Sequence, residues 1–224
     1  RVVDIPCHDG PGVPGWLPEA LIREAQTTPA PSLVCLRPGM RFEEQLYALP
    51  ALPESRPRLR EGGAVLITGG TGGLGLLLAG VLFDQCRARL ALTARWAPPP
   101  EDAWPERARH DDRIGRALAA VLELRSRGAD VMIVEADTAD RGQVACALEA
   151  TRARYGGLHG VIHAAGALQP APVLEKTPAN AARVFGAKVH GAFHLDELFA
   201  DEPLDVFLQV SSQASHFPGP GQVD

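Results

Sequence analysis

A glycine-rich turn between an apolar run and a segment of helical length most constrains how this sequence can fold. Residues 64–68, Ala-Val-Leu-Ile-Thr, have the composition of a strand that is buried on both faces of a sheet. Glycines dominate residues 69–75, and an apolar segment then runs to Phe83. This order is typical of a dinucleotide site, because the turn lets the backbone approach a pyrophosphate and the helix start offers free N–H groups. The alternative is a glycine-rich turn that binds nothing.

Composition excludes several classes of function. The 224 residues carry a net charge of -5, which argues against a nucleic-acid surface. No apolar run approaches the length of a membrane span, and the start does not resemble a signal peptide. The scattered cysteines show no CxxC spacing, so we expect a reducing, cytoplasmic setting without disulfides or a metal site. The cysteines are Cys7, Cys35, Cys86 and Cys146.

Residues 1–60 differ in character from the rest of the chain. They contain one helical pattern at 18–25, one strand pattern at 32–37, and a proline-containing stretch, 41–60, that is typical of an extended linker. A lone strand cannot build a core. Because the sequence also starts with Arg1 rather than Met, we expect this region to be the end of a domain whose beginning lies outside the sequence.

Residues 61–224 alternate regularly between strand and helix patterns, and this predicts an α/β fold with a Rossmann-like, doubly wound parallel sheet. Residues 97–112 read as a long polar loop. The predicted strands are 64–68, 89–93, 131–135, 158–163 and 204–210, and the predicted helices are 73–85, 114–126, 141–154 and 178–199.

The residues after each predicted strand indicate which dinucleotide would bind, since ligands lie beyond the carboxyl ends of such strands. The second strand exits at Ala94-Arg95 with no acidic residue for a ribose 2′-hydroxyl, so Arg95 is expected to pair with the 2′-phosphate of NADP(H). The alternative is a solvated surface arginine. Asp137, after the third strand, is placed to accept from the adenine amino group, and Asp140 to cap the next helix.

Small residues follow the fourth strand, in His163-Ala164-Ala165-Gly166, and would let the backbone approach the nicotinamide ribose. His163 itself is expected to pack against the cofactor face rather than titrate. The residues predicted to bind the cofactor are Thr68, Gly69, Gly70, Thr71, Gly73, Leu74, Gly75, Ala94, Arg95, Asp137, Thr138, His163, Ala164, Ala165 and Gly166.

Four sequence blocks in order resemble the ketoreductase domains of modular type I polyketide synthases, within the short-chain dehydrogenase/reductase superfamily. The blocks are 63–75 (with the TGxxxGxG turn), 161–166, 187–192 and 207–212. The resemblance implies that 1–60 is the remnant of a structural subdomain plus linker, and that 61–224 is an NADPH-binding catalytic subdomain. It also implies reduction of the β-keto group of an intermediate carried on the phosphopantetheine arm of an acyl carrier protein, beside neighbouring synthase domains.

The resemblance also implies catalytic residues. Ketone reduction needs an acid and a group that polarises the carbonyl, which in this family are a tyrosine and a serine, with a lysine that keeps the tyrosine acidic. Ser212 matches the serine, with Ser211 as a structural strand-end residue, and Lys188 matches the lysine. The tyrosine would be the residue after Asp224, so we expect the sequence as it stands to be inactive.

Some positions depart from the family pattern or leave alternatives open. Leu168-Gln169-Pro170 replaces the Leu-Asp-Asp that often marks formation of the D-alcohol, and Phe217 stands where the other type often carries a tryptophan. The stereochemistry therefore stays open, with the L-alcohol weakly favoured. His190 and His194 have metal-ligand spacing but no third ligand, so surface or packing roles are favoured. Other functions considered are a redox-inactive NADPH-binding scaffold or epimerase, and a free-standing reductase of small alcohols.

Overall fold

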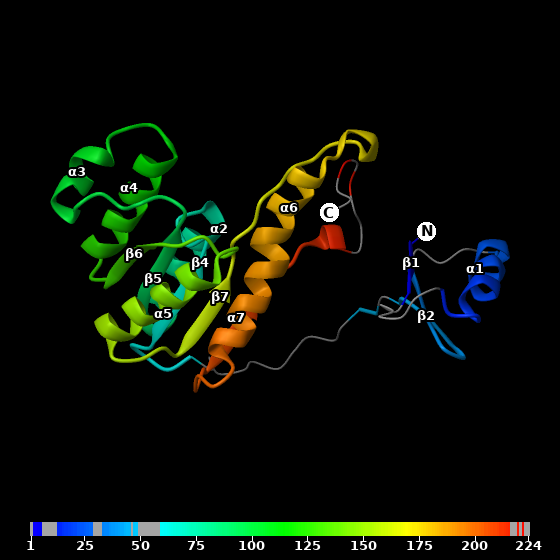
Figure 1. The fold of residues 1–224 in the computed structure, drawn as a ribbon. Coiled ribbons are helices and arrows are strands. Elements are labelled where there is room, and N and C mark those ends of the chain that lie inside the picture. Colours follow the sequence, from blue (N-terminus) through cyan, green and yellow to red (C-terminus); the bar gives the residue numbers. More distant parts are fainter. Residues whose placement is uncertain are drawn as a thin grey trace. The chain divides into compact units, whose positions relative to one another are not determined.

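The computed structural model describes residues 2–5, 13–28, 33–45, 47–48, 59–215, 219 and 221. The chain divides into two compact units, residues 1–55 and 56–224 (Figure 1), whereas the sequence predicts a boundary after residue 60.

The first unit holds more structure than the sequence predicts. Its strands form a sheet in the order β1-β2-β3, in which β1 is parallel and β3 antiparallel to β2. The expectation of a lone strand was wrong, because the stretch taken as a linker begins with β3, which returns along β2 through a turn with Gly39 at φ +70°. Leu17, Val34 and Leu36 form a small core. The elements are β1 (Val2–Asp4), α1 (Leu17–Gln26), β2 (Leu33–Arg37) and β3 (Met40–Glu43).

The second unit contains a five-stranded parallel sheet in the order β6-β5-β4-β7-β8, which confirms the predicted Rossmann-like α/β fold. The strand order reverses direction between β4 and β7, the first and fourth strands of this unit in sequence. In such sheets a crevice opens at that point, beyond the carboxyl ends of the strands. The strands are β4 (Ala64–Thr68), β5 (Arg89–Ala94), β6 (Val131–Glu135), β7 (Gly160–His163) and β8 (Val206–Gln209).

Helices cover both faces of this sheet because alternate strand residues point to opposite sides. Val65 and Ile67 of β4 share a core cluster with residues of α2 and α4, whereas Ala64 and Leu66 pack with residues of α5 and α7. Every residue of β4 is therefore buried, which explains its uninterrupted apolar sequence. The helices are α2 (Gly73–Cys86), α4 (Arg113–Ser126), α5 (Arg141–Tyr155), α6 (Pro178–Phe185) and α7 (Gly191–Phe199).

Two segments differ from the prediction. The expected loop 97–112 contains a 3-10 turn, η1 (Glu101–Ala103), and the short helix α3 (Trp104–Arg107). Trp104 is only 2% exposed and packs under the guanidinium of Arg125. This buried side chain fixes a segment that its prolines led us to predict as a loop. Further short 3-10 turns are η2 (Val173–Glu175) and η4 (Gln213–Ser215).

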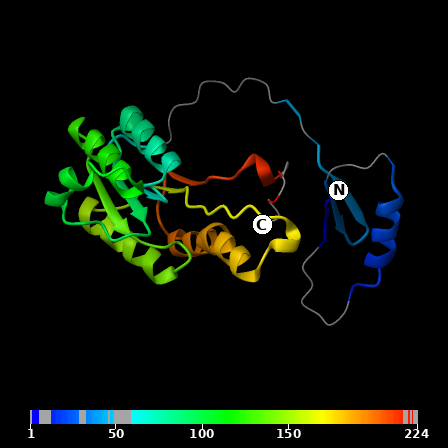
Figure 2. The ribbon, with the colours of Figure 1, turned by 90° about the horizontal axis from the view of Figure 1, so that it is seen from above.

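The predicted helix 178–199 is interrupted by a π-helical turn, η3 (Gly186–His190), between α6 and α7. The three pieces follow one another as a single helical column (Figures 1 and 2). None of the described helices is long and apolar enough to cross a membrane.

Candidate active site

The glycine turn after β4 is held by contacts that only glycine permits. Gly69 has φ +63°, and its carbonyl oxygen accepts from the Gly72 N–H at 2.9 Å. A Cβ on Gly69 would lie 2.7 Å from the Cα of Ala165, and one on Gly75 would lie 2.6 Å from the Gly69 oxygen. The turn is therefore pressed against both α2 and the segment after β7. Gly73, in contrast, has open space around its Cβ position.

A buried hydrogen bond joins the ends of β4 and β7. The Thr68 hydroxyl lies 2.6 Å from Nδ1 of His163, and both side chains are buried. Burial lowers the pKa of His163 below its usual 6.5, so the ring is neutral near pH 7. His163 is thus a buried neutral residue at the end of β7 that does not line the hollow, and its predicted lack of a catalytic role stays a prediction.

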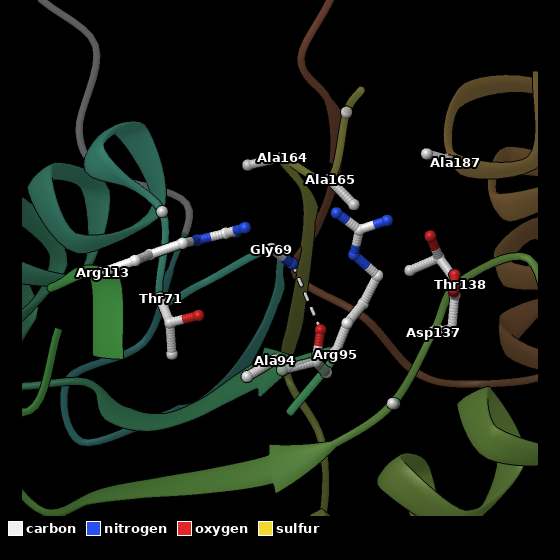
Figure 3. Close-up of a pocket in the computed structure, with 14 residues that line it drawn as sticks. Gly69, Thr71, Ala94, Arg95, Arg113, Asp137, Thr138, Ala164, Ala165 and Ala187 are labelled. Atoms are coloured by element: carbon white, nitrogen blue, oxygen red, sulfur yellow. Dashed lines mark hydrogen bonds between the residues drawn. The ribbon is translucent and has the colours of Figure 1, made fainter. Parts of the chain in front are cut away.

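A hollow opens beyond the carboxyl ends of β4, β5, β6 and β7 (Figure 3). The predicted residues that line it are Gly69, Thr71, Ala94, Arg95, Asp137, Thr138, Ala164, Ala165 and Gly166. Thr68, Gly70, Gly73, Leu74, Gly75 and His163 do not line it. The sequence reasoning missed Gly72, Thr93, Arg113, Ala136 and Ala187, which also line the hollow.

Hydrogen bonds fix the loops around the hollow. Thr93 accepts from the Gly69 N–H at 3.2 Å, which ties the glycine turn to the end of β5. The Asp137 carboxylate accepts from the Ala139 N–H at 3.0 Å. Asp140 caps α5 by accepting from Gly142 and Gln143, which confirms its predicted role and holds its pKa below the usual range. Hydrogen bonds within the protein therefore hold the loops that surround the hollow.

The arrangement fits an adenine dinucleotide. Gly69 and Gly72 line the hollow next to the start of α2, where free N–H groups can bind a pyrophosphate. Arg95 extends its guanidinium into the hollow, and no acidic residue stands beside it at the end of β5 (Figure 3).

The π-helical turn brings Lys188 to the far side of this hollow. Ala187 of η3 is a lining residue, and a Cβ on Gly166 would lie 4.0 Å from Cε of Lys188. The lysine side chain thus approaches the small-residue segment after β7. A single π turn widens the helix by one residue and often marks a functional site. The helical periodicity of the sequence does not predict this π turn.

Ser212 is not among the residues that line the hollow. It follows β8, is exposed, and accepts from the Ala214 N–H at 3.1 Å at the start of η4. Its backbone oxygen accepts from both the N–H and the hydroxyl of Ser215. No hydrogen bond joins Ser212 to Lys188 within the described part of the chain. Phe217, used in the stereochemical comparison, lies outside the described residues.

His190 of η3 and His194 of α7 have different surroundings. His194 places Nδ1 3.0 Å from the Thr138 carbonyl oxygen, whereas His190 is exposed. Among the described residues no group of three His, Cys, Asp or Glu side chains could hold a metal ion.

Comparison with known proteins identifies the family. The family described as "KR domain" matches residues 63–224. Polyketide synthase ThaG of Burkholderia thailandensis is 37% identical over 175 residues, which are 78% of this chain and 3% of ThaG. One phenolphthiocerol/phthiocerol polyketide synthase of Mycobacterium tuberculosis is 33% identical over 99% of this chain and 12% of that synthase. The chain thus spans a small part of the curated relatives it matches.

Solved structures agree with this assignment. A ketoreductase domain from the bacillaene assembly line has a TM-score of 0.70 and 30% identity, covering 92% of this chain and 45% of that one. PlmKR1, the ketoreductase from the first module of phoslactomycin biosynthesis in Streptomyces sp. HK803, has a TM-score of 0.73 and 28% identity, covering 98% and 46%. With its parallel sheet and its glycine turn, the chain therefore belongs to the KR domain family, the ketoreductase domains of polyketide synthases.

Proposed function

We propose that this domain uses NADPH to reduce the β-keto group of an intermediate bound to an acyl carrier protein, giving a β-hydroxyacyl thioester. Membership of the KR domain family supports ketone reduction as the chemistry. The names of its relatives support a polyketide chain as the substrate and other synthase domains as neighbours. The described cysteines are free thiols, which is consistent with a cytoplasmic setting.

One observation carries the choice of cofactor. Arg95 projects into the hollow at the end of β5, where NAD-binding folds of this architecture usually present a carboxylate to the ribose 2′-hydroxyl. Its planar guanidinium can form two parallel hydrogen bonds to a phosphate. We therefore assign the cofactor as NADP(H).

The chain's own residues would orient and polarise the ketone. NADPH, when bound, supplies the hydride equivalent that the β-carbon receives. The hydroxyl group of Ser212 would donate a hydrogen bond to the ketone oxygen. This bond would stabilise the negative charge that develops on the oxygen during reduction. Lys188, near Gly166, would place a cation beside the acid that protonates this oxygen. In the proposed reaction that acid would be a tyrosine that follows Asp224, as the family resemblance implies.

Ser212 accepts from Ala214 in the present arrangement, so its hydroxyl hydrogen remains available for donation. The strand pairing supports this role, because His163 pairs with Gln209 and the segments that carry Gly166 and Ser212 therefore leave neighbouring strands. Catalytic hydrogen bonds are often long before the substrate complex forms.

The test measures NADPH consumption with a β-ketoacyl thioester mimic, using the protein extended beyond Asp224. Ser212→Ala should lower kcat by roughly 100-fold or more, whereas the neighbouring control Ser211→Ala should stay within about threefold of the unsubstituted protein. NADPH binding without turnover would reject reduction and favour a redox-inactive scaffold or epimerase. Absence of NADPH binding would reject the cofactor assignment.

A further inference from the structure

Three arginines near the hollow lack the partners that other arginines of this unit have. Arg95, Arg113 and Arg183 make no ion pair or hydrogen bond among the described residues. Arg87 stacks over the Phe83 ring, 4.8 Å from its centroid. Every other described arginine of residues 56–224 donates to a carboxylate or a carbonyl oxygen. Free guanidinium groups are therefore exceptional in this unit.

All three arginines line the same hollow. A second, shallower hollow adjoins the first and is lined by all three, together with Trp96, Asp112 and Asp137. Arg95, Arg113 and Asp137 line both hollows. Figure 3 shows the side chains of Arg95 and Arg113 entering the space above Thr71 and Ala94 from different sides. The two groups come from separate elements, the end of β5 and the start of α4.

The acidic residues at this place do not balance the three cations. Asp112 accepts from Arg107 at 2.8 Å and from the Gly115 N–H at 2.8 Å, and these contacts lower its pKa to about 2. Its charge is thus already matched by Arg107. Asp137 is held by the Ala139 N–H and forms no ion pair with any described residue. At least two arginines therefore remain without a counter-charge, and such an excess of positive charge favours the binding of a dianion.

We infer that Arg113 forms a clamp with Arg95 around one phosphate monoester, the 2′-phosphate of NADPH, and so acts as a second residue that selects this cofactor over NADH. The inference rests on the proposed function only for the identity of the cofactor. Two guanidinium groups from different elements can bind the phosphate from two sides, which a single flexible arginine cannot do. Free pantetheine 4′-phosphate carries the same monoester phosphate and is the alternative source, whereas the arm attached to a carrier protein is a diester with a single negative charge.

The experiment compares the binding of matched ligands to the full chain by calorimetry. The ligands are NADP⁺ and NAD⁺, adenosine 2′,5′-bisphosphate and adenosine 5′-monophosphate, and pantetheine 4′-phosphate. Arg113→Gln should weaken the binding of both 2′-phosphorylated ligands by roughly tenfold or more, because it removes charged hydrogen bonds. Binding of NAD⁺ and adenosine 5′-monophosphate should stay within about twofold, since these ligands lack the 2′-phosphate.

Arg116→Gln is the matched control, because Arg116 lies on the same helix but pairs with Asp111 and lines neither hollow. It should leave every affinity unchanged, and Arg113→Lys should restore part of the lost affinity. The salt dependence of NADP⁺ binding should also become shallower in Arg113→Gln.

Equal loss of NAD⁺ and NADP⁺ affinity in Arg113→Gln, or no loss, would overturn the inference. So would a loss confined to pantetheine 4′-phosphate, or an unsubstituted protein that binds NAD⁺ and NADP⁺ equally. The readout is ligand binding, so failure of ketone reduction alone would reject the proposed function and leave this inference standing.

Discussion

At the scale of single residues, the glycine turn shows which glycines are required by packing. Gly75 sits in the first turn of α2 with the backbone of Gly69 and Gly70 directly against its Cβ position. Gly73, two residues earlier in the same helix, has nothing within 4 Å. Of the three glycines in the TGxxxGxG spacing, packing therefore requires Gly69 and Gly75 but not Gly73.

This contrast gives a stability prediction. Gly75→Ala should lower the free energy of unfolding by about 1–3 kcal/mol, because the methyl group must displace backbone atoms. Gly73→Ala should leave it unchanged or raise it by less than about 1 kcal/mol, since alanine restricts the unfolded chain and meets no obstacle. Urea denaturation of the two variants checks this, and equal effects would contradict it.

Two histidines make stability depend on pH. Burial lowers the pKa values of His163 and His159 below 6.5, so near pH 6 the folded chain binds fewer protons than the unfolded chain. Stability should therefore be fully present above about pH 7 and fall as the pH drops below about 6.5. Asp112 and Asp205 have pKa values of about 2, so their contribution is lost only at much lower pH.

Denaturation at pH 7.5, 6.5 and 5.5 measures this slope. His163→Gln, which can still bond to Thr68, should show a shallower slope than the unsubstituted protein, with the remainder due to His159. An unchanged slope would show that the pKa of His163 is the same in the folded and unfolded chain.

At the scale of elements, η3 is positioned by close packing at both ends. Gly186 faces Ala139, and a Cβ on Gly191 would lie 3.0 Å from Cβ of Thr138 and 3.2 Å from Cε1 of His163. These contacts press the π turn against the loop after β6 and the end of β7. They thereby fix the approach of Lys188 to Gly166.

Substituting two helical glycines should have opposite effects. Gly191→Ala should lower the free energy of unfolding by about 1–3 kcal/mol and weaken NADPH binding, because it pushes η3 away from Thr138. Gly80→Ala is the matched control on α2, where the nearest atom is 4.0 Å away. It should stabilise the chain by about 0.5–1 kcal/mol and leave binding unchanged. Thermal unfolding with and without NADPH measures both effects.

At the scale of the whole molecule, the two units have cores of very different size. The core of residues 1–55 rests on Leu17, Val34 and Leu36, whereas two large clusters cover the two faces of the second sheet. Small domains bury a smaller fraction of their surface and are correspondingly less stable.

We therefore predict that amide protons of β2 exchange with solvent at a lower free energy of opening than those of β4. Hydrogen exchange by mass spectrometry on the full chain measures both. Equal opening energies that change together on adding denaturant would show that the two units unfold as one.

Local sequence signals were enough to predict the α/β architecture and most of the residues around the hollow. Apolar runs buried on both faces, glycine turns and helix caps are such signals, so β4, β6 and the cap at Asp140 matched their predicted positions. The packing of Trp104, the pairing of β3 with β2 and the π turn at Lys188 gave no local signal. Each depends on contacts with residues elsewhere in the chain.

Which side chains share the hollow depends on tertiary packing. Arg95 was identified from its place after a strand, but Arg113 lies 18 positions later at the start of a helix, where an arginine is normally a solvated residue. Only the packing of α4 against α2 and β6 brings Arg113 to the same hollow as Arg95, and neither cation has a partner among the described residues. Charge pairing depends on distances in space, which sequence spacing does not encode across a connection of this length.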